Sequence, residues 1–519
     1  MRKLITFIIV ILTTLNFFAC NSSQRITTLD IQATSITSSV NTDSNTISVL
    51  DTELTTFSRL STPINVQVID NVITFDPVLF AQKYRLVIYS QSDNYFGEYE
   101  INSGEDLSSI LIEGLYSYQL YAIANDYLDS EKTIKTNFEI IGLNQVKVIE
   151  GSEMNNLEYI RWFGRNYFDQ IENAKYFYFT ASGFEIAFYG TELKATFLAD
   201  NYEDLDKQAY LVVLLDNEAD PTKGTTLVLD QAEAEYVLVE GLDYGYHTVK
   251  LLKRSEASDS NTALKQILTD GYFTNPPESK DFNIQFIAAS SSTGYGNLGN
   301  LSDNKTTANS DGLRAFAYLT TYLLDAEISI FAASGWGVSR GYNTLGNISE
   351  IENIPKAFEY IAIDSSNTVF QAAGKWNQED FIPDVIVVNL GTNDFNSSNY
   401  YAMGTLDKID IEHRFWIDYT NFLVLLHQMY PNAYIIVAYG LMNESALLKD
   451  ITLEIINEAN LLIGETKVFS FEMEGAGTLD NPYGSNYHPN VKTSKNVANS
   501  LAEFISDLTG REIVREIFE

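Results

Sequence analysis

The pattern of apolar residues changes near residue 281, and this change constrains the fold more than any other feature of the chain. Beyond it, five apolar runs predict buried strands; they span 284–289, 328–333, 385–390, 434–438 and 467–471. Helical stretches lie between these runs, most clearly residues 411–429, where apolar residues recur at helical spacing before Pro431. Strands that alternate with helices predict an α/β domain over 281–510, with a parallel sheet flanked by helices.

The chain before this point has a different pattern, with short apolar runs of period two between turn residues. Residues 60–142 predict a small β-sandwich that resembles a fibronectin type III or immunoglobulin-like module. Residues 145–275 predict a second sandwich, of jelly-roll type. We therefore expect a multidomain protein with two N-terminal β-sandwiches followed by the α/β domain.

The first 58 residues predict export and tethering. Arg2 and Lys3 precede an apolar stretch that ends at Cys20, the only cysteine of the chain. This arrangement resembles the signal peptide and lipidation site of a bacterial lipoprotein; an ordinary cleaved signal or an uncleaved anchor is the alternative. Residues 21–58 are rich in Ser, Thr, Asn and Asp, which is typical of a flexible tether. We expect a protein that is lipid-anchored at the outer face of the bacterial cell membrane, or else secreted.

The charge of the chain disfavours several classes of partner. There are 69 acidic against 33 basic residues, which gives a net charge of −36. This balance disfavours binding to nucleic acid or to anionic lipid through charge. No His/Cys cluster or phosphate-binding glycine loop is evident, so we expect neither metal nor organic cofactor. We also expect a monomer whose only membrane contact is its lipid anchor.

Three polar or small residues fall at the ends of predicted strands. Ser290 ends the first strand, and Gly335 and Asn393 follow the second and third. Ligands of parallel α/β sheets bind beyond the carboxyl ends of the strands. A serine there can act as a nucleophile, while a glycine N–H and an asparagine amide can stabilise an oxyanion. Ser291 and Ser292 compete with Ser290, and turn or capping roles remain open for all of them.

His488 is the best candidate for a general base. The chain has four histidines. His247 lies on a predicted strand, and His413 and His427 lie on the predicted helix. Only His488 lies in a loop, before Pro489 and after the last predicted strand. A loop at this edge of the sheet can bring an imidazole within hydrogen-bonding reach of a serine.

Together these residues resemble the SGNH hydrolase superfamily, and within it carbohydrate esterase family 2. The resemblance lies in four blocks, which are 286–296 around Ser290, 334–337 around Gly335, 391–394 around Asn393 and 487–489 around His488. Segments 160–165, 182–186 and 251–256 also resemble the jelly roll of that family. The resemblance implies Ser290 and His488 as catalytic residues, and Ser290, Gly335 and Asn393 as the oxyanion hole.

The chain departs from the family pattern at two positions. Ala289 stands where the nucleophile block usually carries Asp, and Asn486 stands where an Asp usually orients the histidine. A neutral side chain cannot stabilise the charged imidazole as a carboxylate does. Asn486 and Asp480 are candidates for the third member. In parts of the family a backbone carbonyl orients the imidazole of a Ser–His dyad.

The resemblance implies a serine esterase that removes O-acetyl groups from a polysaccharide such as xylan or glucomannan. Tyr295, Trp336 and Tyr487 adjoin the site residues and are candidates for stacking on sugar rings; core packing is the alternative. Two other functions remain open: a catalytically impaired glycan-binding lipoprotein, and an esterase that acts on peptidoglycan or lipid esters.

Overall fold

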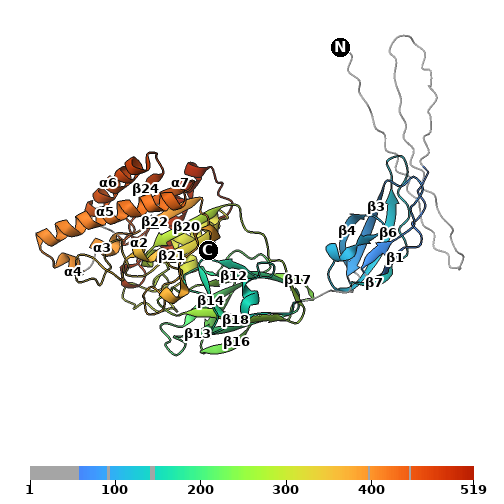
Figure 1. Cartoon of the computed structure of the whole chain (residues 1–519), viewed down its shortest axis with the longest axis horizontal. Coiled ribbons are helices and arrows are strands. Elements are labelled where there is room, and N and C mark those ends of the chain that lie inside the picture. The colour runs from blue at the N-terminus through green and yellow to red at the C-terminus, as the bar shows by residue number, and fades with distance from the viewer. Residues whose placement is uncertain are drawn as a thin grey trace, which may run out of the picture. The chain divides into compact units, whose positions relative to one another are not determined.

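The computed structural model describes residues 58–69, 71–90, 94–140, 146–395, 398–442 and 446–518. The chain divides between residues 144 and 145 into two compact units, each described here by itself (Figure 1). The predicted signal segment with Cys20, and the predicted tether up to residue 57, lie outside the described residues. Within the described ranges, no helix is both long and apolar enough to cross a membrane.

The first unit consists of two antiparallel sheets. Its four-stranded sheet has the order β4 (Tyr95–Ile101), β3 (Lys83–Ser90), β6 (Gly114–Ile123), β7 (Thr136–Ile140). Its three-stranded sheet has the order β1 (Gln67–Ile69), β2 (Val72–Thr74), β5 (Glu105–Asp106). Ile73, Leu86 and Leu120 are fully buried in the common core. The alternation read from the sequence therefore corresponds to a two-sheet structure.

The second unit begins with two larger antiparallel sheets, here called the sandwich domain. One sheet has the order β10 (Asn166–Asp169), β11 (Ala174–Phe177), β18 (Thr262–Thr269), β13 (Leu193–Ala199), β16 (Glu233–Val239), with β8 (Val148–Glu150) beside β18. The other has the order β15 (Thr225–Leu229), β14 (Ala209–Leu215), β17 (Gly245–Lys253), β12 (Gly183–Gly190), β19 (Tyr272–Thr274), with β9 (Arg161–Phe163) beside β12.

Period-two alternation explains how these sheets pack. On β12, Phe184, Ile186 and Phe188 point into a core that they share with Ala195 and Phe197 of β13 in the opposite sheet. Successive side chains of a strand point to opposite faces, so each strand needs only every second residue to be apolar. The β-rich character of this region is as predicted, while the named sandwich classes stay predictions.

A five-stranded parallel sheet follows, here called the α/β domain. The strand order is β21 (Glu327–Ala332), β20 (Asn283–Ala288), β22 (Val385–Asn389), β23 (Tyr434–Tyr439), β24 (Val468–Glu472). After β20, the chain adds β21 on one side of this strand and then crosses back to add β22 on its other side. The strand order thus reverses beside β20, and the carboxyl ends of β20 and β22 flank the crevice where such sheets bind ligands.

Helices cover both faces of this sheet, as predicted (Figure 1). The helices are α1 (Phe316–Leu323), α2 (Ile354–Ala357), α3 (Thr392–Phe395), α4 (Ser398–Tyr401), α5 (Thr405–Met429), α6 (Ala446–Ile463) and α7 (Val491–Thr509). Side chains of α5 and α6 share one core with Ile287 of β20, and those of α1 and α7 share the other with Phe286. Neighbouring residues of one strand thus face opposite helix layers.

Helix α5 begins at Thr405, earlier than the predicted 411–429. Its first turns, including Leu406 and Ile409, are largely exposed, so they do not extend the buried apolar face of the predicted segment.

Buried cationic side chains join the sandwich domain to the α/β domain. Arg165, in the turn between β9 and β10, is fully buried and donates hydrogen bonds to the carbonyl oxygens of Phe358 and Tyr360. Its guanidinium lies 4.2 Å from the ring centre of Phe331 and 4.4 Å from that of Phe358. Burial lowers its pKa to about 9, so it stays charged at neutral pH.

Replacing Arg165 by methionine should lower the free energy of unfolding of the second unit by about 2–4 kcal/mol, because two buried carbonyl groups lose their donor. Urea unfolding followed by tryptophan fluorescence measures this unit alone. All four tryptophans lie in it, namely Trp162, Trp336, Trp376 and Trp416.

The matched control is Lys265→Met, which removes an exposed ion pair with Glu233 in the sandwich domain. It should change stability by no more than about 0.5 kcal/mol. Equal effects of the two substitutions would contradict a joining role for Arg165.

Candidate active site

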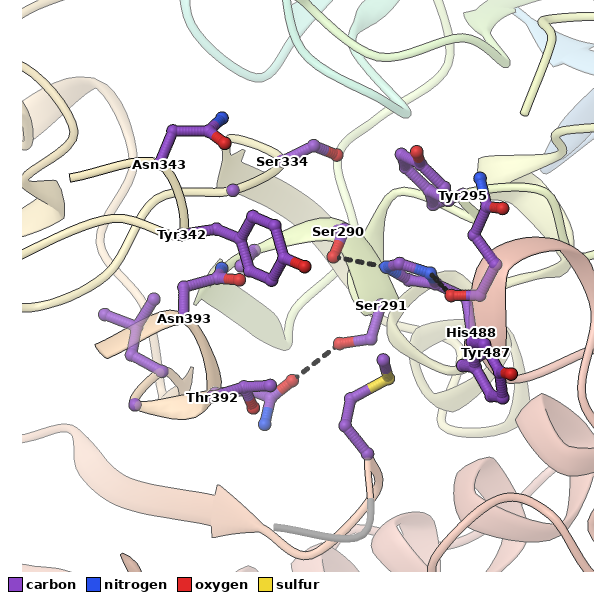
Figure 2. A pocket seen from close by; sticks show the side chains of 17 residues that line it. Ser290, Ser291, Tyr295, Ser334, Tyr342, Asn343, Thr392, Asn393, Tyr487 and His488 are labelled. Carbon is purple, nitrogen blue, oxygen red and sulfur yellow. Dashed lines mark hydrogen bonds between the residues drawn. The ribbon is translucent and has the colours of Figure 1, made fainter. Parts of the chain in front are cut away.

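Ser290 and His488 meet at the carboxyl edge of the parallel sheet. Ser290 begins a 3-10 turn directly after β20, and its Oγ lies 2.8 Å from Nε2 of His488 (Figure 2). Ser291 instead donates to Oδ1 of Asn389 at 2.8 Å, and Ser292 is fully buried. Of the three competing serines, Ser290 is the one that the structure pairs with the imidazole.

The backbone, rather than an acidic side chain, orients the imidazole. Nδ1 of His488 lies 3.1 Å from the carbonyl oxygen of Asn486. A carbonyl only accepts, so Nδ1 carries the proton and Nε2 is left to accept the Ser290 hydroxyl proton. The side chain of Asn486 is therefore not the third member. Asp480 is not either, because its side chain is 92% exposed and forms an ion pair with Lys492.

Two successive left-handed residues direct this carbonyl toward the ring. Asn486 has φ 50° and Tyr487 has φ 64°. Asparagine tolerates this conformation better than most residues do, whereas it is rare for tyrosine. The N–H of buried Ser485 donates to the carbonyl oxygen of Gly296, which fixes the turn against the loop that follows Ser290. The turn thus stores local strain at the candidate site.

The surroundings of His488 favour the neutral imidazole. The ring of Tyr295 stacks on it, with 4.1 Å between centroids and an interplanar angle of 24°. Burial lowers the pKa of His488 to about 4, although the carbonyl of Asn486 and the charge of Glu256 act in the opposite direction. His488 is therefore an unprotonated base at neutral pH.

Gly335 and Asn393 face the same cavity as Ser290 and His488. The cavity has a volume of about 700 Å³, and Figure 2 shows Asn393 and His488 on opposite sides of Ser290. Gly335 follows β21 with φ 84°, which favours glycine, and its N–H finds no acceptor among the described residues. Asn393 donates one amide hydrogen to the carbonyl oxygen of Trp336 at 2.7 Å and has a second to offer.

Asp394 fixes the loop that carries Gly335. Its fully buried carboxylate accepts the N–H groups of Val338, Ser339 and Arg340 at 2.9–3.0 Å. A Cβ atom at Gly337 would overlap this carboxylate, so the loop approaches it as closely as only glycine allows. Burial raises the pKa of Asp394 to about 6, against the lowering effect of the three N–H groups. The two neighbouring residues of this motif thus have different roles. Asn393 faces the cavity, and Asp394 holds the loop that forms part of its wall.

The three aromatic candidates have different positions. Trp336 was a candidate for stacking on a sugar, with core packing as the alternative, and the structure contradicts the first: Trp336 is fully buried, and its indole Nε1 lies 3.1 Å from Oδ1 of Asn367. Tyr295 lines the cavity, but its ring stacks on His488. Tyr487 is 63% exposed at the cavity rim, where stacking on a sugar stays a prediction.

Several lining residues were not expected from the sequence; they are Ser334, Tyr342, Asn343, Thr392 and Met442. Tyr342 lies in the long loop between β21 and α2, where no periodicity marks any residue. Its N–H donates to the carbonyl oxygen of Gly335, so it lies beside the candidate oxyanion hole. Ser334 and Thr392 lie inside the blocks 334–337 and 391–394, so the sequence pattern could have indicated only these two of the five.

Comparison with known proteins accounts for this combination of domains. Residues 162–277 match the family model described as "Carbohydrate esterase 2 N-terminal". The sandwich domain is therefore similar to the N-terminal domain of carbohydrate esterase family 2. This match confirms the resemblance for the sandwich domain, and similar proteins that cover about two thirds of the chain confirm it for the α/β domain.

Two curated relatives cover different shares of the chain. This chain is 25% identical to the cellulase/esterase CelE of Acetivibrio thermocellus over 338 residues. The aligned region covers 64% of this chain and 37% of that protein. It is 26% identical to an acetylxylan esterase / glucomannan deacetylase of Cellvibrio japonicus over 260 residues. That aligned region covers 48% of this chain and 63% of that protein. The chain thus spans less than two thirds of the length of either relative.

Solved structures of the family share the fold. A family two carbohydrate esterase from Clostridium thermocellum, in complex with cellohexaose, has a TM-score of 0.56 and 25% identity, covering 68% of this chain and 99% of that one. The acetyl xylan esterase Est2A from Butyrivibrio proteoclasticus has a TM-score of 0.59 and 22% identity, covering 71% of this chain and 99% of that one.

We expect His488 to be neutral at pH 5.5, because its pKa lies near 4. His247 should be largely protonated there. Burial acts to lower its pKa, but the carbonyl of Asp243 and the carboxylate of Asp216 raise it overall above the ordinary 6.5. Histidine ring NMR shifts measure both charge states in one sample, and variants that lack each ring assign the signals. A protonated His488 at pH 5.5 would contradict its assignment as the neutral base.

Proposed function

We propose that this protein is a serine esterase that removes O-acetyl groups from a polysaccharide such as xylan or glucomannan, through an acyl-enzyme intermediate. One observation carries the proposal: Ser290 Oγ lies 2.8 Å from Nε2 of His488 in a cavity that Gly335 and Asn393 also line. A nucleophile, a base and two oxyanion donors around one space are the arrangement that acyl transfer needs.

The reaction follows from this geometry. Nε2 of His488 accepts the hydroxyl proton as Oγ of Ser290 bonds to the acetyl carbonyl carbon. The carbonyl oxygen becomes an oxyanion, which accepts hydrogen bonds from the N–H groups of Gly335 and Ser290 and from the amide of Asn393. The imidazolium returns the proton to the sugar oxygen as the ester bond breaks. Water then attacks the acetyl-serine by the same route and releases acetate.

A Ser–His dyad suffices for this mechanism. The carbonyl of Asn486 supplies the orientation that a third carboxylate would otherwise give. The imidazolium lacks a directly bonded carboxylate, so its stabilisation comes from this carbonyl dipole and from charges farther away. This compensation favours an active esterase over the impaired glycan-binding alternative.

The names of the relatives support the substrate class. The curated Cellvibrio japonicus relative is an acetylxylan esterase / glucomannan deacetylase, and the Clostridium thermocellum structure contains cellohexaose. In this chain, exposed Tyr342 and Tyr487 at the cavity suit stacking on sugar rings. We extend the proposal to a monomer anchored through Cys20 at the outer cell surface, with residues 60–142 as a fibronectin type III-like spacer.

Ser290→Ala should lower kcat for acetate release from acetylated xylan and glucomannan by at least about 1,000-fold, because the nucleophile is lost. Ser292→Ala is the matched control. Its buried hydroxyl has no hydrogen-bond partner among the described groups and does not line the cavity, so activity should stay within about twofold.

Release that persists in folded Ser290→Ala would contradict the nucleophile. Absence of release from the unaltered protein would contradict the polysaccharide O-acetyl substrate. Assays with acetylated peptidoglycan and lipid esters would then decide between the remaining substrates.

A further inference from the structure

The segment Lys253–Glu256, at the end of β17, is held by buried hydrogen bonds and takes no part in the proposed reaction as described above. Lys253 is fully buried and donates to the carbonyl oxygens of Tyr178, Glu256 and Ser260. Arg254 donates to carbonyl oxygens of the α/β domain, those of Ser310 at 2.8 Å and Ala308 at 2.9 Å. These bonds fix the turn that follows β17 and with it the position of Glu256.

Glu256 reaches the wall of the candidate active site from the sandwich domain. It is 3% exposed, and its Oε2 accepts the hydroxyl of Ser334 at 2.5 Å. Ser334 lines the cavity and directly precedes Gly335, whose N–H is a proposed oxyanion donor. The hydrogen bond therefore fixes the residue before the oxyanion hole.

The other carboxylate oxygen of Glu256 is connected to His488 by a chain of contacts. Oε1 of Glu256 lies 3.2 Å from Nζ of Lys305, which also forms an ion pair with Asp259. Nζ of Lys305 lies 5.6 Å from the ring centre of Tyr295, and this ring stacks on His488. One carboxylate of the sandwich domain thus contacts Ser334 directly and is linked to His488 through Lys305 and Tyr295.

We propose that Glu256 is a positioning residue of the esterase reaction, which holds Gly335 through Ser334 and the imidazole plane of His488 through Lys305 and Tyr295. The inference rests on the proposed function, which it deepens. It also explains why the sandwich domain accompanies the α/β domain: the active site includes a residue that only the sandwich domain supplies.

Electrostatics distinguish this role from simple packing. Ser290, Tyr295 and the carbonyl of Asn486 surround the His488 ring, and the charged groups that act on it are Glu256 and Lys305. The negative charge of Glu256 raises the pKa of His488, and the positive charge of Lys305 lowers it. Neutralising them one at a time should therefore move the pKa of His488 in opposite directions.

The test has a kinetic arm. Glu256→Ala and Ser334→Ala should each lower kcat for acetate release by about 10- to 100-fold with little change in KM, because displacing a transition-state donor slows chemistry more than binding. Glu256→Gln keeps the size of the side chain and one acceptor oxygen, and it should recover part of the loss. The control Glu233→Gln removes an exposed carboxylate of the same domain and should leave kcat unchanged.

The second arm does not depend on esterase activity. Histidine NMR should show a lower pKa of His488 in Glu256→Gln and a higher one in Lys305→Met, with tryptophan fluorescence verifying the fold. If Lys305→Met does not fold, Glu256→Gln alone decides this arm. An unchanged pKa of His488, or an unchanged kcat in folded Glu256→Ala, would overturn the inference. Shifted pKa values in a protein that releases no acetate would uphold the coupling and reject the proposed function instead.

Discussion

The structure of the second unit depends on cationic side chains buried between its two domains. A buried guanidinium only donates hydrogen bonds and needs acceptors, and Arg165 and Arg254 find acceptors in backbone carbonyls of the α/β domain. This requirement fixes the two domains as one body. It also places the turn after β17 against the loop that carries Ser334. The interface between the two domains therefore includes part of the cavity wall.

The order of the parallel strands determines where the chemistry lies. Because β20 has β21 on one side and β22 on the other, the segments that follow all three strands converge at one edge. Ser290, Gly335 and Asn393 come from these three segments, and the loop before α7 adds His488. All four residues line one cavity in this structure.

Much of this arrangement could be predicted from the sequence, because strand ends and a lone loop histidine are local features. That argument made Ser290 and His488 candidates, the family resemblance implied them as the catalytic pair, and the structure places them in contact. Trp336 shows its limit: adjacency to Gly335 suggested the cavity, but the backbone turns at this glycine and directs the indole into the core. The orienting carbonyl of Asn486 depends on two left-handed residues, which no side-chain motif specifies. Glu256 precedes Ser334 by 78 residues and lies in another domain, so only the folded chain brings them together.

Covalent labelling of the serine tests the central claim most directly, namely that a dyad oriented by a carbonyl activates Ser290. The intact protein is treated with an alkyl fluorophosphonate near neutral pH, digested, and mapped by mass spectrometry. We expect one adduct, on Ser290, that fails to form in His488→Ala. An adduct on Ser291 or Ser292, or no adduct on the folded protein, would contradict it.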